Sequence, residues 1–154
     1  MKIILAGDPV LKQVAEPVTK FDKDLKYLVE QMKKTMYEAN GVGLAAPQVN
    51  VSKRLFVADD GESGFEEYIN PVWEPIGDEK NIDTEGCLSV PDLYGEVERY
   101  SRVRVKYQDR HGKKRQKDTE GLLARCVQHE TDHLNGILFI EKAISLHKGK
   151  SADE

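Results

Sequence analysis

The sequence has few cysteines and no long hydrophobic run. Its 154 residues include only 2 cysteines, which excludes a scaffold built on several disulfides. No apolar stretch approaches the roughly 20 residues that a membrane-spanning helix needs, so we expect no membrane partner. The start resembles a secretion signal only briefly, because its apolar segment is short and ends at Asp8-Pro9. These absences favour a reducing compartment, and we expect a cytoplasmic protein.

The sequence also lacks a concentrated patch of positive charge. It has 23 Lys and Arg residues against 27 Asp and Glu residues, a formal net charge of −4. The short basic cluster at 113–115 is too small to indicate a nucleic-acid site. The composition, 39% hydrophobic and 32% charged, is typical of a globular chain. We expect residues 1–154 to form a single domain with a short C-terminal tail from about residue 146.

Two segments have the pattern of helices. Apolar residues recur at helical spacing from Asp22 to Ala39, which predicts an amphipathic helix. A second helix is predicted in the apolar run 122–138. Asp118 or Thr119 is the expected N-cap of this second helix, and Asn135-Gly136 is its expected end.

The rest of the chain is rich in short segments with strand character. Adjacent strands with few helices between them favour an α+β fold over alternating strands and helices. The segment 76–83 is polar and has no clear pattern, and Asn70-Pro71 is interpreted as the end of a strand. Strands are predicted at residues 53–59, 68–70, 97–99, 103–108 and 115–119, and residues 2–6 are interpreted as a short strand or an extended lead-in.

The second predicted helix contains a His-Glu-x-x-His pattern at residues 129–133. His129 and His133 lie about 40° apart on one helical face and one turn apart, so both imidazoles can reach one divalent metal ion. Glu130 is turned by about 100° from His129, which suits a general base that touches a nearby water without binding the metal. The alternative is a helix with two incidental histidines. The apolar neighbours favour a buried helix, where polar side chains need partners.

A third ligand decides what kind of metal site this is. Glu141 is too close to fold back as the downstream glutamate of thermolysin-like proteases, and Phe139 stands where metzincins have a third histidine. Cys126 begins about 10.5 Å along the helix axis from His133, and its side chain leans further away. Cys87, in a glycine-flanked segment upstream, is the best remaining soft ligand. A Cys-His-His site with a position open for water indicates a hydrolytic centre.

A further segment, 41–48, reads Gly-Val-Gly-Leu-Ala-Ala-Pro-Gln. Its two glycines permit close approach of the backbone to a ligand. The alternative is a tight turn from helix to strand. A phosphate-binding loop is disfavoured, because no Gly-Lys-Ser/Thr sequence follows.

Three segments together, 41–48, 85–89 and 128–133, resemble the three signature segments of the peptide deformylases. They occur in the family's order and at its spacings, and the resemblance extends from Gly7-Asp8-Pro9 to about Glu141. It implies an α+β fold with antiparallel β-sheets packed around a central metal-binding α-helix. It also implies a metal-dependent hydrolase that removes the formyl group from the formylmethionine of newly synthesised polypeptides and releases formate.

The resemblance implies roles for individual residues. Glu130 is the expected acid and base of catalysis. The Gln48 side-chain amide and the Leu88 main-chain N–H are expected to stabilise the oxyanion. The expected metal ligands are Cys87, His129 and His133. The expected substrate-binding residues are Val42, Gly43, Glu85, Tyr94, Leu122, Arg125 and Cys126.

The resemblance also implies a cofactor and partners. Ligand chemistry alone favours zinc for a Cys-His-His site, whereas the resemblance implies Fe²⁺ in the cell, with Zn²⁺ or Ni²⁺ able to occupy the site. The partners are N-formylmethionyl nascent polypeptides, met in a transient encounter with the ribosome. Many members have an arginine in place of Tyr94 and a longer C-terminal helix. The ribosome-docking role of such extensions is therefore not carried over.

Overall fold

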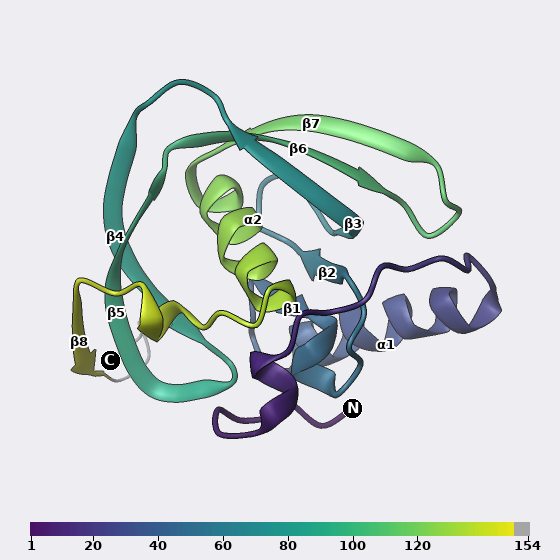
Figure 1. The fold of residues 1–154 in the computed structure, drawn as a ribbon, viewed down its shortest axis with the longest axis horizontal. Coiled ribbons are helices and arrows are strands. Elements are labelled where there is room, and N and C mark those ends of the chain that lie inside the picture. Colours follow the sequence, from purple (N-terminus) through teal and green to yellow (C-terminus); the bar gives the residue numbers. More distant parts are fainter. Residues whose placement is uncertain (150–154) are drawn as a thin grey trace.

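Helix α2 (Gly121–Leu134) lies between two antiparallel sheets in the computed structural model, which describes residues 1–149. Figure 1 shows β3, β6 and β7 above α2 and β4, β5 and β8 to its left. The five-stranded sheet consists, in order, of β1 (Gly43–Ala45), β2 (Leu55–Ala58), β3 (Glu66–Pro75), β6 (Arg102–Gln108) and β7 (Lys114–Glu120). The three-stranded sheet consists of β4 (Lys80–Cys87), β5 (Val90–Tyr100) and β8 (Ser145–Lys148). The α+β prediction is confirmed.

Helix α1 (Lys23–Glu38) forms where the spacing of apolar residues predicted it. The side chain of Asp22 caps it by accepting a hydrogen bond of 3.1 Å from the Leu25 N–H. The buried face, which includes Val29, Met32 and Met36, packs against the core beside β1 and β2. Burial of each such side chain contributes about 1.5–3 kcal/mol.

Helix α2 is buried almost all round, as its apolar neighbours predicted. The predicted N-cap is wrong: Glu120 occupies the cap position, and its side chain makes no capping hydrogen bond. Asp118 instead pairs with Arg104 across β6 and β7, and the Thr119 hydroxyl donates to the Val103 carbonyl. Both residues belong to a strand, because pairing with β6 continues up to the first turn of α2. The helix ends at Leu134, with Asn135 as its C-cap and Gly136 at a positive φ of 73°, so the predicted end at Asn135-Gly136 is confirmed.

Several of the predicted strand positions need correction. The strand predicted at 97–99 covers only the last part of β5, which begins at Val90. Residues 2–6 form no strand, which excludes the first of their two interpretations, and the Ile4 N–H donates to the Gln48 carbonyl. β3 does not end at Asn70-Pro71 but continues to Pro75, because a register shift after Ile69 absorbs the positive φ of Asn70. β4 begins inside the segment without a clear pattern, since most of its side chains are exposed and show no alternation.

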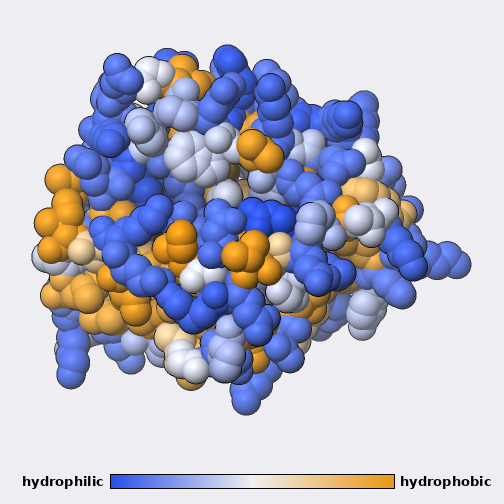
Figure 2. All heavy atoms as spheres, in the orientation of Figure 1, coloured by the Kyte–Doolittle hydropathy of each residue, from blue (hydrophilic) through white to orange (hydrophobic). Residues whose placement is uncertain are grey.

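β8 forms the edge of the smaller sheet and pairs with β5, so that His147 lies opposite Tyr94. Figure 2 shows hydrophilic side chains over most of one face and hydrophobic ones gathered at its left side, where β8 lies in Figure 1. Ile144 and Leu146 are 64% and 48% exposed. None of the helices in the described part of the chain has the length and apolar character needed to cross a membrane.

Candidate metal centre and active site

The structure brings Cys87, His129 and His133 together. Cys87 ends β4, and the two histidines stand one turn apart on α2. One ligand atom from each residue lies within 4.8 Å of the other two, and the Cys87 Sγ is 3.3 Å from the His133 Nε2. A thiolate and two imidazoles in this arrangement fit a divalent zinc, iron or nickel ion.

The pKa values of the two histidines are shifted in opposite directions. His129 shares a 2.8 Å hydrogen bond between its Nδ1 and Glu85, which leaves its Nε2 facing the other ligands. Burial lowers the pKa of His129, but Cys87 and Glu85 outweigh burial and raise it well above its usual value. A proton at Nε2 therefore competes with a metal. Burial, followed by the charge of His129, holds the pKa of His133 well below its usual value, which favours the neutral imidazole that a metal site needs.

Cys126 lies apart from this cluster. Its Sγ is 4.0 Å from the Val42 carbonyl oxygen, and the thiol is buried. Burial, reinforced by the charge of Glu130, raises the pKa of Cys126 well above its usual value. Because the thiolate is the metal-binding form, Cys126 is a poor ligand at neutral pH. Cys126 is outside the group of side chains that could hold a metal, as its distance from His133 along the helix predicted.

Glu130 lies beside the metal ligands without joining them. Its Oε2 is 3.9 Å from the His129 Nε2, and its Oε1 is buried with no hydrogen-bond partner among the described residues. Burial raises the pKa of Glu130 to about 7, which suits a group that takes up and returns a proton near neutral pH. A Cβ at position 43 would lie 2.7 Å from Oε2, so only glycine leaves room for the carboxylate.

The side-chain amide nitrogen of Gln48 lies beside Cys87, at the ligand cluster. Its Oε1 accepts a 2.9 Å hydrogen bond from the Ala45 N–H, which fixes the orientation of the amide. Its Nε2 then lies 3.1 Å from the Ser89 Oγ and 3.5 Å from the Cys87 Sγ. Leu88 occupies the turn between β4 and β5, beside Cys87. Ser89 received no role from the sequence, although its place in the 85–89 segment was a usable signal.

A buried ionic network supports the metal ligands. The Arg99 Nε and Nη2 donate hydrogen bonds of 2.9 Å to the two carboxylate oxygens of Glu85. The Arg99 Nη1 is 2.7 Å from the Asp132 Oδ2. Burial alone would raise the pKa of Glu85, but hydrogen bonds from Arg99 and His129 hold it well below its usual range. Lys142, about half exposed, adds a 3.1 Å contact to Asp132 that the sequence did not suggest.

Replacing Arg99 by Met should destabilise the fold strongly, because Glu85 and Asp132 would remain buried without their shared cation. We expect the free energy of unfolding to fall by about 3–5 kcal/mol, measured by urea titration in excess chelator so that metal binding makes no contribution. Arg104→Met is the matched control. Its pair with Asp118 is exposed, so stability should change little. Equal losses in the two variants would contradict the argument.

A cavity of about 660 Å³ opens beside the cluster. His133 does not line it and is 1% exposed. The other predicted site residues all lie on its wall: Val42, Gly43, Gln48, Glu85, Cys87, Leu88, Tyr94, Leu122, Arg125, Cys126, His129 and Glu130.

A buried His-Glu-x-x-His helix, a cysteine from a strand beside its histidines and an adjoining cavity define the class of metal-dependent hydrolases. A family model described as polypeptide deformylase matches residues 1–149, and the chain belongs to that family. A peptide deformylase of Carboxydothermus hydrogenoformans is 52% identical over 151 residues, which cover 97% of each chain. The crystal structure of the Thermotoga maritima peptide deformylase is 49% identical, with a TM-score of 0.90 over 94% of this chain and 97% of that one. A Synechococcus elongatus deformylase in complex with actinonin has a TM-score of 0.90 and 43% identity, covering 94% of this chain and 79% of that one.

Proposed function

We propose that the cavity beside Cys87, His129 and His133 binds the formylmethionine end of a new polypeptide and hydrolyses the formyl amide. The observation that carries this proposal is the position of Glu130 and Gln48. Glu130 lies beside His129, and Gln48, from a separate segment of the chain, lies beside Cys87. A base and a fixed amide donor next to one metal site are the parts that amide hydrolysis needs. Members of the family remove the N-formyl group from nascent polypeptides, and membership of the chain in that family supports the proposal.

Each residue of the proposed site has a separate role in the hydrolysis of the formyl amide. A divalent ion bound by the three ligands supplies Lewis-acid chemistry, which makes a water more acidic and a carbonyl more electrophilic. Glu130 accepts the proton of the attacking water and returns it to the leaving amine. The Gln48 amide and the Leu88 main-chain N–H donate to the formyl oxygen as it gains negative charge. Removal of one such donor commonly lowers the rate about 10²- to 10³-fold.

The proposal extends to cofactor, partners and location. Fe²⁺ is the expected ion in the cell, and Zn²⁺ or Ni²⁺ also fits a thiolate and two imidazoles. The substrate is a nascent chain, so the enzyme meets the ribosome transiently and works in the cytoplasm. The residues 1–154 act as a single catalytic domain.

The test is an assay of formyl-Met-Ala beside unformylated Met-Ala peptides. The protein should release formate from the first peptide, and the activity should disappear with a chelator and return with metal. Cleavage of peptide bonds in both substrates would instead identify a metallopeptidase. Metal binding without any turnover would identify a catalytically inactive metal-binding domain. Actinonin, which the Synechococcus elongatus relative binds, should compete with formyl-Met-Ala.

Tyr94 is the candidate for holding the substrate backbone at the cavity wall. Its ring fits closely between Gly86 and Gly149, where added Cβ atoms would approach ring carbons to 2.8 and 2.6 Å. The imidazole of His147 on β8 stacks nearby, with ring centroids 6.3 Å apart. The ring is therefore confined, and its hydroxyl is the polar atom that Tyr94 can offer to a peptide.

Tyr94→Phe keeps this packing and removes only the hydroxyl. We expect KM for formyl-Met-Ala to rise about 2- to 12-fold, the equivalent of one uncharged hydrogen bond of about 0.5–1.5 kcal/mol, with kcat nearly unchanged. Steady-state kinetics over a range of peptide concentrations measure both constants. An unchanged KM would mean that the hydroxyl does not bind the substrate.

A further inference from the structure

Arg125 is a buried charge whose terminal nitrogens are fully engaged by the protein. Its side chain is 9% exposed. Nη1 donates to the Glu85 Oε2 at 2.6 Å and to the Val97 carbonyl at 2.9 Å. Nη2 donates to the carbonyl and the side-chain oxygen of Asn81, at 3.0 and 2.5 Å. Because each terminal nitrogen carries two hydrogens, none of these donors remains for a substrate.

Glu85 is saturated by its neighbours. Its Oε2 accepts from the Arg99 Nε and the Arg125 Nη1, and its Oε1 accepts from the Arg99 Nη2 and pairs with the His129 Nδ1. A carboxylate with four such contacts cannot rotate without breaking at least one of them. The direction of the His129 ring is therefore set by Glu85, and that of Glu85 by the two arginines.

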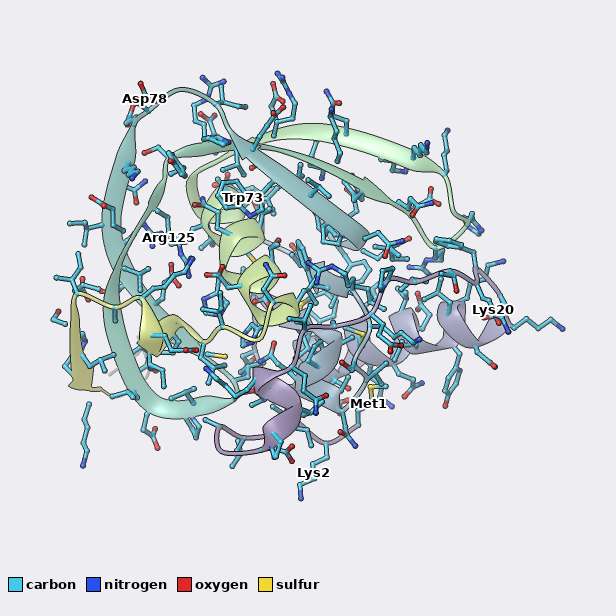
Figure 3. All side chains as sticks on the ribbon, viewed as in Figure 1. Met1, Lys2, Lys20, Trp73, Asp78 and Arg125 are labelled. Atoms are coloured by element: carbon cyan, nitrogen blue, oxygen red, sulfur yellow. The ribbon has the colours of Figure 1, made fainter. Side chains whose placement is uncertain are left out.

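Arg125 also joins the parts of the fold that carry the metal ligands. It lies one turn before His129 on α2, and Figure 3 shows its side chain beside the helix on the side of β4 and β5. Asn81 is near the start of β4, the strand that ends in Cys87, and Val97 is on β5. One guanidinium thus links the helix with two histidines to the strand pair with the cysteine.

We propose that Arg125 is a positioning residue, which orients His129 for the metal through Glu85 and serves the substrate cavity only as part of its wall. This inference rests on the proposed metal site. A competing idea is that Arg125 acts only as a charge. Removing Arg125 takes one positive charge from the network of Arg99, Arg125, Lys142, Glu85 and Asp132, and this change by itself favours a bound cation.

The two ideas predict opposite effects on metal retention. The test is the rate at which the zinc-loaded full-length protein releases Zn²⁺ into an excess of a coloured chelator. Orientation of the ligands predicts faster release from Arg125→Met than from wild type, by about 10- to 100-fold, as is typical when a partner of a metal-bound histidine is lost. Release at the wild-type rate or more slowly would overturn the proposal.

Arg110→Met is the matched control. Arg110 holds Glu67 with two nitrogens and Glu30 with a third, and among the described residues this group makes no hydrogen bond to a metal ligand. This variant should lose stability but release Zn²⁺ at the wild-type rate. Equal acceleration in both arginine variants would show general loosening and would overturn the proposal.

A second variant keeps the test decisive if Arg125→Met does not fold. Asn81→Ala removes one anchor of the guanidinium at an exposed residue and leaves the charge in place. Asn81→Ala should also accelerate the release of Zn²⁺, by less than Arg125→Met does. If Arg125→Met does not fold, an unchanged release rate in Asn81→Ala would overturn the proposal.

Wild-type protein should bind one Zn²⁺ per chain. Failure of wild type to bind Zn²⁺ would refute the proposed metal site itself, which separates that failure from an error about Arg125.

Discussion

Glu130→Gln should keep the metal and the fold and lose most of kcat. The substitution preserves the shape of the side chain but removes its ability to accept a proton, and the loss should be about 10²- to 10⁴-fold, the usual contribution of a general base. KM should change little, because the loss concerns the transition state. The Glu130 carboxylate does not coordinate the metal in this prediction, so metal content per chain should equal that of wild type.

The measurement is single-substrate kinetics with formyl-Met-Ala, with metal content determined on the same preparation. The fold is checked by circular dichroism. Because Glu130 packs against Gly43, the isosteric amide avoids the cavity that a shorter side chain would leave. Retention of more than about a tenth of wild-type kcat would mean that another group accepts the proton.

Cys87→Ser should abolish both metal binding and activity. Serine is a poor ligand at neutral pH because its hydroxyl stays protonated, whereas a thiolate binds zinc or iron strongly. Cys87 is also the ligand that β4 contributes, so its loss leaves only the two histidines of α2. The expected result after dialysis is less than a tenth of the wild-type metal content, by an order-of-magnitude estimate from soft-ligand loss.

Cys126→Ala is the matched control for this experiment. Its thiol lies on the cavity wall, outside the ligand cluster, so the metal should remain stoichiometric. Stability should fall by about 1–2 kcal/mol, as expected for a small change in a packed site. A metal-free Cys126→Ala protein together with a metal-bound Cys87→Ser protein would reverse the assignment of the ligand.

The structure agrees with the sequence most closely where interactions are local. The helical repeat puts His129 and His133 on one face, and the same repeat predicts the buried face of α1. The two strands at 103–108 and 115–119 differ little from β6 and β7, because alternation and a short turn act within a few residues. The three motif segments were sufficient to indicate the family.

The supporting contacts depended on the tertiary structure. Asn81 lies in a polar segment with no pattern, and only the pairing of β4 with β5 brings it to Arg125. Thr119 has a side chain that could cap a helix, yet it belongs to β7 because it pairs with Val103 of β6. Such contacts join residues far apart in the chain, so their formation depends on which surfaces are buried together and on which polar groups must then be satisfied. By itself the sequence determined the helix that places His129 and His133 on one face, because the helical repeat is local, and the tertiary structure decided how Glu85, Arg99 and Arg125 hold that helix to the strand that carries Cys87.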